Sequence, residues 1–298
     1  DRVSRLSLGW QDDISEGGKM SESIELGELV KTGISAFKAE NESQQMAAFQ
    51  RPRDEGKVLE GALKELKLAP DFAKKAYYSI PYKDKKGNTV LVEGPSIKAA
   101  MALARRWGNS SNGGRSVENL DDRLMVQGVF IDYETNTRTL REVPVSKFSY
   151  DTNTKSMVPL REDKLIMAIQ AGMSKAIRNA IIQSLPLYLV DRYIQEAKSL
   201  TIKNGGKTIK PLDIHARLEN MAVSLVEKGA NRSAVEMYIS DLMKTKNEAD
   251  LLTTITGTLN AIDEGHVSIE DVFGSYIPGK EIEKGPISLT TVLSPSKK

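Results

Sequence analysis

Apolar residues recur at helical spacing along much of the first two thirds of the chain. Two glycines interrupt the pattern over residues 22–48, whereas residues 54–67 have a cleaner pattern that predicts an amphipathic helix. The longest helix is predicted over residues 161–184, where apolar side chains stand at every fourth position. Leu185-Pro186 ends this helix, and a shorter one is expected to continue to about Leu200.

Alternating and short apolar runs predict the strands. A hairpin is expected from residues 76–82 and 89–92, with Lys86-Gly87-Asn88 in its turn. Pro95 and Gly108 then bracket a predicted helix, because proline favours the first turn of a helix and glycine the position after its last residue.

Three more strands are predicted after Gly113-Gly114, near residues 115–119, 124–133 and 137–147. Together with the long helix they give the order ββαβββα. This order is typical of an α+β protein with an antiparallel sheet, and not of alternating βαβ units. The chain also lacks the GxGxxG motif of doubly wound nucleotide-binding folds.

The last third of the chain has only helical patterns, and residues 203–211 (KNGGKTIKP) before it are typical of a linker. We therefore expect a separate, small all-α module after an α+β core. The expected organisation is a flexible leader at 1–20, the core at 21–202, the linker at 203–211, the module at 212–276 and a disordered tail at 277–298. Met20 is a candidate natural start that would follow an added segment.

The composition excludes several kinds of site. Cysteine is absent, which excludes disulfides, thiolate metal sites and cysteine nucleophiles, and His215 and His266 are too few for a histidine-rich metal site. No stretch approaches the roughly 18–20 apolar residues of a membrane span, and no secretory signal pattern opens the chain. An intracellular protein without a membrane anchor is expected.

The net charge of +2 conceals a segregation of charge along the chain. Lysine and arginine are in excess over residues 51–115 and 161–210, and acidic residues are in excess in the segments on either side. A basic middle between acidic ends favours a body that binds a polyanion, with acidic accessory parts. Chance clustering is the alternative.

The motif Gly205-Gly206-Lys207-Thr208 resembles the end of a phosphate-binding loop. The position of the first glycine is Thr201, however, and Pro211 blocks the helix whose amides should face the phosphate, so a linker is favoured. Asp213 and His215 could lie close together, but an exposed pair at a helix start explains them without catalysis.

A second motif leaves a nuclease open. Glu162 and Lys164, with Asp132 from a preceding strand, match a pattern in which two carboxylates hold Mg²⁺ and a lysine steadies the nucleophile. Acidic residues at a predicted helix start also complement the helix dipole, and this interpretation is favoured. We therefore predict no catalytic residues, no metal ligands and no cofactor.

Basic side chains form a stripe on each of two predicted helices, away from the apolar stripe. One stripe consists of Lys98, Arg105 and Arg106, and the other of Lys164, Lys175 and Arg178, with Arg161 at its start. Such stripes can follow a phosphate backbone, although surface lysines often share a face by chance.

Tyrosines of the first predicted strand add a possible stacking surface. Tyr77 and Tyr78 point to opposite faces, so one of them turns away from the core, and bases can stack on such a ring. Tyr78 and Tyr82 are therefore candidate DNA-binding residues, with half-buried strand tyrosines as the alternative. Trp107 is expected in the core.

Short motifs in the basic middle resemble known phage proteins. The stretch Glu93-Gly94-Pro95-Ser96-Ile97-Lys98-Ala99-Ala100, followed by Arg106-Trp107-Gly108-Asn109, resembles a phage and prophage family with a GPSI-helix-WGN signature, a hairpin like that of residues 133–137 and a long helix. Residues 171–181 (AGMSKAIRNAI) are similar to the K-A-x-R-x-A helix of the phage single-strand annealing proteins, the Redβ, RecT and Erf groups. The resemblance covers roughly residues 46–200, and more loosely 212–275.

The resemblance implies annealing of complementary single strands without ATP in phage recombination, on an oligomeric ring or filament with a basic groove. Lys175 and Arg178 match the basic positions of the family's long helix, whereas Lys164, Lys98 and Arg105 follow from helical geometry alone. It further implies the cytoplasm of a bacterial host, and a recombination exonuclease or single-strand-binding protein as partner of residues 212–276. The rival interpretations are a Mg²⁺-dependent nuclease and a phage structural or assembly protein.

Overall fold

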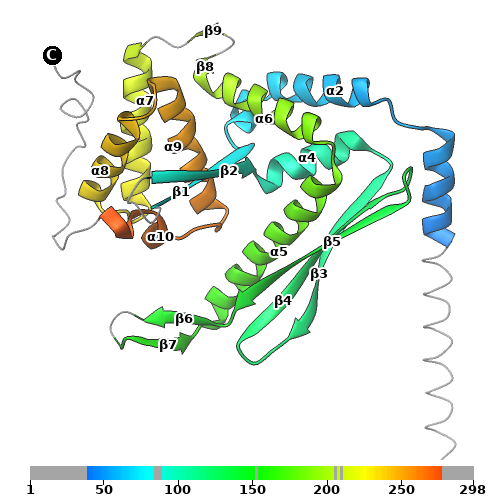
Figure 1. Ribbon diagram of the computed structural model, residues 1–298, viewed down its shortest axis with the longest axis horizontal. Coiled ribbons are helices and arrows are strands. Elements are labelled where there is room, and N and C mark those ends of the chain that lie inside the picture. The colour runs from blue at the N-terminus through cyan, green and yellow to red at the C-terminus, as the bar shows by residue number, and fades with distance from the viewer. Residues whose placement is uncertain (1–38, 84–88, 152–153, 205–206, 209–210, 277–298) are drawn as a thin grey trace, which may run out of the picture. The chain divides into compact units, whose positions relative to one another are not determined.

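The computed structural model describes residues 39–83, 89–151, 154–204, 207–208 and 211–276 (Figure 1). The chain forms two compact units, residues 1–51 and 52–298. In the first unit, residues 39–50 are helical, in agreement with the end of the pattern over 22–48. The expected leader, the turn at 86–88 and the expected tail from 277 lie outside the described residues. None of the described helices is long and apolar enough to cross a membrane.

The second unit begins with the elements that the sequence predicts. Helix α2 (Glu55–Leu68) is capped by Asp54, whose side chain accepts from the Lys57 N–H, and the short α3 (Pro70–Ala73) follows. Strands β1 (Tyr77–Lys83) and β2 (Thr89–Pro95) pair antiparallel. Helix α4 (Ile97–Trp107) has Ser96 as its N-cap, whose side chain accepts a hydrogen bond from the Ala99 N–H. Its C-cap is Gly108, whose φ of 65° favours glycine.

The main sheet has the order β3-β4-β5, all antiparallel, with strands at Ser110–Asn119, Arg123–Asp132 and Thr137–Ser146. β3 begins earlier than predicted, because Gly113-Gly114 lies inside the strand. A second hairpin, β6 (Phe148–Asp151) with β7 (Ser156–Pro159), was not predicted from the sequence. Its strands are four residues each and mostly exposed, so they carry little apolar pattern. The α+β class with antiparallel sheets is confirmed.

Helix α5 (Glu162–Ser184) lies across one face of this sheet (Figure 1). Glycines on both elements bring the two backbones close, since a Cβ at Gly128 would lie well under 3.0 Å from the backbone of Ala176. Val126, Val143 and Val145 fill the space beside this contact. Leu185-Pro186 ends α5 as predicted, and α6 (Leu187–Ile202) follows. Leu189 and Tyr193 of α6 are buried in a hydrophobic core that also contains residues of α2 and α4.

The last third of the second unit is helical, as the sequence predicts. It contains α7 (Pro211–Glu227), α8 (Arg232–Met243), α9 (Glu248–Asp263), α10 (Ile269–Phe273) and the 3₁₀ turn η1 (Gly274–Tyr276). These elements bury a core of their own around Leu218, Tyr238 and Ile255. The expected linker contains two short paired strands, β8 (Lys203–Asn204) and β9 (Lys207–Thr208).

The helical segment packs directly on the α+β part and does not stand apart as a detached body. Gly257 of α9 lies against Ser79 of β1, at a distance where any side chain would collide. Asn260 Nδ2 donates to the carbonyl oxygens of Lys74 and Tyr77, at 2.7 Å in both cases. Tyr77 and Ser79 are fully buried, and burial raises the pKa of Tyr77 to about 12. Residues 52–298 accordingly form one compact unit.

The close approach of α5 to the sheet gives a first prediction. Gly128→Ala places a methyl group against the Ala176 backbone, which cannot move aside as a flexible side chain can. We expect a loss of about 3 kcal/mol or more in the free energy of unfolding, measured by denaturant titration. Gly113→Ala is the matched control, because a Cβ there has no described atom within 4 Å. Equal stability of the two variants would contradict this packing.

The contact between α9 and β1 gives a second prediction. A chain ended after Ile202 exposes Tyr77 and Ser79 and loses both hydrogen bonds from Asn260. We expect its melting temperature, followed by circular dichroism, to fall by roughly 10 °C or more. A truncated chain that melts at the temperature of the full chain would show that the two parts are energetically independent.

Candidate nucleic-acid interface

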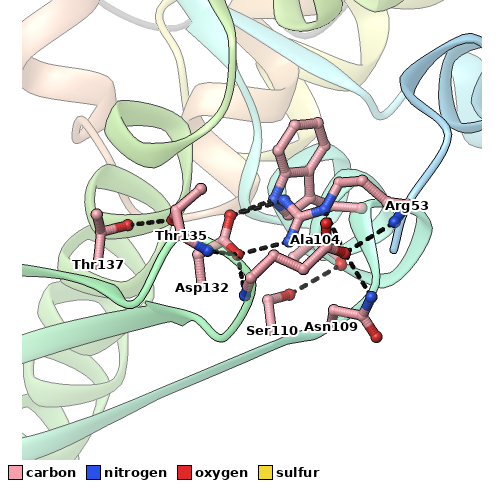
Figure 2. Close-up of polar contacts among 9 residues, drawn as sticks. Arg53, Ala104, Asn109, Ser110, Asp132, Thr135 and Thr137 are labelled. Atoms are coloured by element: carbon pink, nitrogen blue, oxygen red, sulfur yellow. Dashed lines mark hydrogen bonds and ion pairs between the residues drawn. The ribbon is translucent and has the colours of Figure 1, made fainter. Parts of the chain in front are cut away.

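A buried ionic cluster lies where α4, β3 and the turn between β4 and β5 meet (Figure 2). The Arg53 guanidinium donates to both oxygens of Asp132, at 2.6 and 2.5 Å, and its carbon lies 4.1 Å from the centre of the Trp107 ring. Trp107 Nε1 donates to Asp132 Oδ2 at 2.9 Å. The Arg53 and Asp132 side chains are 7% and 5% exposed. Trp107 is buried, as expected.

Glu134 extends this cluster to the next turn. Its Oε1 accepts from the backbone N–H and Nε of Arg53, at 2.9 and 3.0 Å, and from Asn109 Nδ2. Burial alone would raise the pKa of Glu134, but hydrogen bonds from Asn109 and Arg53 outweigh it and hold the pKa below its ordinary value. Asn109 and Asn136 both adopt positive φ, at 42° and 52°, where asparagine is better tolerated than most residues. The residues of the WGN and hairpin motifs therefore build the fold.

This geometry separates the three residues of the nuclease pattern. β4 and α5 run in the same direction, because Val126 lies beside Gly172 and Gly128 beside Ala176. Glu162 is fourteen residues before Ala176, and Asp132 is four residues after Gly128. The two carboxylates are thus roughly 30 Å apart. Within the described part of the chain, no group of three or more acidic or histidine side chains could hold a metal ion.

An open cleft of about 320 Å³ lies between the hairpin β1–β2, strand β5 and helix α5. Its lining residues are Tyr78, Pro95, Arg141, Arg178, Asn179, Ile182 and Gln183. Two of these are arginines and two are amides, and no acidic side chain is among the described residues that line it. Such a lining suits a ligand that carries negative charge and hydrogen-bond acceptors.

Arg178 is held inside the wall of this cleft, and is not on an exposed stripe as helical spacing had indicated. The residue is 6% exposed. Its guanidinium carbon lies 4.8 Å from the centre of the Tyr78 ring, and its Nη1 is 2.7 Å from His266 Nε2. Burial lowers the pKa of Arg178 from its ordinary value, although arginine remains protonated in proteins. Tyr78 therefore supports Arg178 with one ring face.

Two lysines extend the positive charge from the cleft. Lys175 is exposed and precedes Arg178 by one turn on α5, so the two residues are neighbours on the same face. Lys98 on α4 is 46% exposed and pairs with Glu264, with 3.4 Å between Nζ and Oε1.

The other predicted DNA-binding residues lie away from the cleft. Arg161 pairs with Asp163, and Lys164 is exposed near the start of α5, about 21 Å along the helix from Arg178. Arg105 and Arg106 both face Glu65 of α2, Arg106 with Nε 2.7 Å from Oε2. Tyr82 is 48% exposed near the far end of β1.

Sequence reasoning did not find Arg141, Glu264 and His266. Arg141 lies on β5 in register with Gly128 and is exposed, and nothing in a strand pattern indicates that it will face α5. For His266 there was a weak signal, since Glu264-Gly265-His266 follows a predicted helix and glycine is typical of the position after a helix end. The pairing of that turn with α5 is a tertiary contact that periodicity does not reveal.

The ionic cluster gives a third prediction. Asp132→Asn keeps the shape of the side chain but leaves the Arg53 guanidinium buried with only Glu134 to balance it. We expect a loss of about 3 kcal/mol in the free energy of unfolding, measured in denaturant. The control is Asp122→Asn, which removes an exposed pair with Arg123 and should cost less than about 1 kcal/mol. Unchanged stability of Asp132→Asn with loss of Mg²⁺-dependent strand cleavage would restore the nuclease interpretation.

Comparison with known proteins adds no relative: no family model, no curated protein and no solved structure matches the chain. The similarity to the phage annealing proteins is therefore one of short motifs. Of these, the WGN and hairpin residues serve the buried cluster, whereas Lys175 and Arg178 lie at the cleft. The functional conclusion depends on the cleft.

Proposed function

We propose that the protein binds single-stranded nucleic acid without sequence preference and anneals complementary strands without ATP. The cleft carries this proposal, because it combines two arginines and two amides and the described residues that line it include no acidic side chain. Lys175 adds an exposed positive charge one turn before Arg178 on α5, and Lys98 on α4 forms an ion pair with Glu264. A phosphate backbone is the polyanion that such a surface fits, and contacts to phosphates are independent of sequence.

Most of the affinity should come from phosphate contacts. Arg178 already lies over one face of the Tyr78 ring, so that face is not open to a nucleobase. Tyr82 is more exposed and can offer a stacking surface farther along β1. Asn179 and Gln183 can donate to phosphate or sugar oxygens from α5. A strand held by its backbone leaves its base edges free to sample a complementary strand.

Annealing follows from this mode of binding without a catalytic step. Duplex formation releases free energy, so no nucleotide hydrolysis is needed once two strands are held with their bases outward. One cleft contacts only a few nucleotides, and we therefore propose that several copies act together as a ring or filament in recombination. β3 and β5 are the edges of the main sheet among the described residues, and each offers backbone groups to another chain.

The proposal is tested by removing charge from the cleft. Arg141→Ala together with Arg178→Ala should weaken binding of a fluorescent single-stranded oligonucleotide about tenfold or more, whatever its sequence. The slope of log affinity against log salt should fall by about 0.7 for each lost phosphate contact. The control is Lys244→Ala, which removes an exposed lysine at the C-cap of α8 that pairs with Asp241, and it should bind as the wild type does.

The same protein preparations distinguish the rival functions. With a quencher on one strand and a fluorophore on its complement, wild type should speed pairing in EDTA without ATP, and the double variant should not. Strand shortening that needs Mg²⁺ would favour a nuclease. Failure of the wild type to bind oligonucleotides at low salt would leave the assembly-protein interpretation and overturn the proposal.

A further inference from the structure

The turn after α9 has a backbone geometry that fixes two side chains next to α5. The His266 N–H donates to the Ala261 carbonyl and the Gly265 N–H to the Ile262 carbonyl, at 2.9 and 3.0 Å. With Gly265 at φ 67°, this is a Schellman motif, a common C-terminal helix cap. A Cβ on Gly265 would lie 3.2 Å from the Ala171 Cβ, so the turn packs closely against α5. Glu264 and His266 are thus placed by a rigid element.

His266 accepts a hydrogen bond from Arg178. A guanidinium has only donors, so at 2.7 Å the His266 Nε2 is the acceptor of this hydrogen bond. The His266 side chain is 3% exposed, and its ring meets the edge of Tyr78 with 5.2 Å between ring centres. Glu264 Oε2 lies 3.2 Å from the same Nε2. Arg178, Tyr78, Glu264 and Lys98 are the charged and titratable groups that face this turn in the described structure.

The Arg178 guanidinium is therefore fixed on three sides. Asn179 Oδ1 accepts from its Nε and Nη2, at 3.3 and 3.0 Å, Tyr78 covers one face, and His266 holds Nη1. These contacts use three of the five guanidinium N–H groups, and Arg178 is one of the residues that line the cleft. Fixing a long, flexible arginine side chain costs rotamer entropy. This entropy is lost when the chain folds, so it does not reduce the free energy of ligand binding.

We propose that His266 is a positioning residue, which orients the Arg178 guanidinium so that its free N–H groups take a phosphate of the bound strand. This inference rests on the proposed function. It gives the helical segment a part in strand binding, beyond any role as a surface for partner proteins. Glu264, from the same turn, has a side chain that is 6% exposed and pairs with Lys98.

The test compares two substitutions that fill the same space. The amide oxygen of His266→Gln can reach the position of Nε2 and accept from Arg178, whereas the thioether of His266→Met is at most a weak acceptor. Oligonucleotide affinity is measured at several salt concentrations for both variants, for Arg178→Ala and for Arg178→Ala with His266→Met. Melting temperatures are measured in parallel, so that a loss of folding is recognised.

We expect His266→Met to weaken binding about threefold or more and to reduce the salt slope toward that of Arg178→Ala. His266→Gln should restore most of both, and the double variant should bind no more weakly than Arg178→Ala alone. If His266→Met folds and binds as wild type, if its loss adds fully to that of Arg178→Ala, or if the Gln variant is as weak as the Met variant, the positioning role is wrong. Absence of binding by wild type would instead overturn the proposed function.

Discussion

The contact between α5 and the main sheet is the constraint on which the arrangement of the site depends. A Cβ at Gly128 would collide with the α5 backbone at Ala176, and Cβ atoms at Gly114 and Gly172 would collide with the side chains of Met173 and Val145. A helix so close to a sheet cannot slide or rotate without collision, because protein interiors are close-packed. The position of α5 along the sheet is thereby fixed, and so is the position of Arg178 in the wall of the cleft between β1, β2 and β5. The same contact keeps Glu162 far from Asp132.

The buried cluster around Asp132 performs a different task for the same architecture. Arg53 lies in the segment before α2, Trp107 at the end of α4 and Glu134 in the turn after β4. The Asp132 carboxylate accepts hydrogen bonds from both Arg53 and Trp107, and Glu134 accepts from Arg53. Removing any one member leaves a buried charge or donor unpaired, which is costly. The motif residues around Trp107 and Asn109 are therefore explained by stability, and their presence does not by itself indicate a nucleic-acid site. The proposed binding site lies at a different place, the cleft lined by residues of β1, β2, β5 and α5.

Much of the fold could be predicted because its signals are local. The caps at Asp54 and Ser96, the break at Leu185-Pro186 and the three long strands all follow from propensity and periodicity. The site was predicted only in part. Helical spacing placed Lys175 and Arg178 on one face, but it could not reveal that Arg178 would be covered by Tyr78 and His266, since those contacts join residues far apart in sequence. Arg141 was missed for the same reason, and the linker pattern at 203–211 gave no sign that α9 would pack on β1.

The acidic character of the last third of the chain can now be reconciled with a role at a polyanion site. Several of its carboxylates are balanced within the structure, Glu264 by Lys98, Asp263 by Lys228 and Glu236 by Arg232. Screening over about 8–10 Å at physiological salt limits the reach of the others, so their repulsion of a strand in the cleft is weak. At close range Arg178 contacts the His266 imidazole and the Tyr78 ring, and the Glu264 carboxylate beside His266 favours its charged form. Because the Glu264 carboxylate also pairs with Lys98, its charge is shared between two basic side chains, and an acidic segment can in this way position Arg178 for the phosphate of the proposed complex.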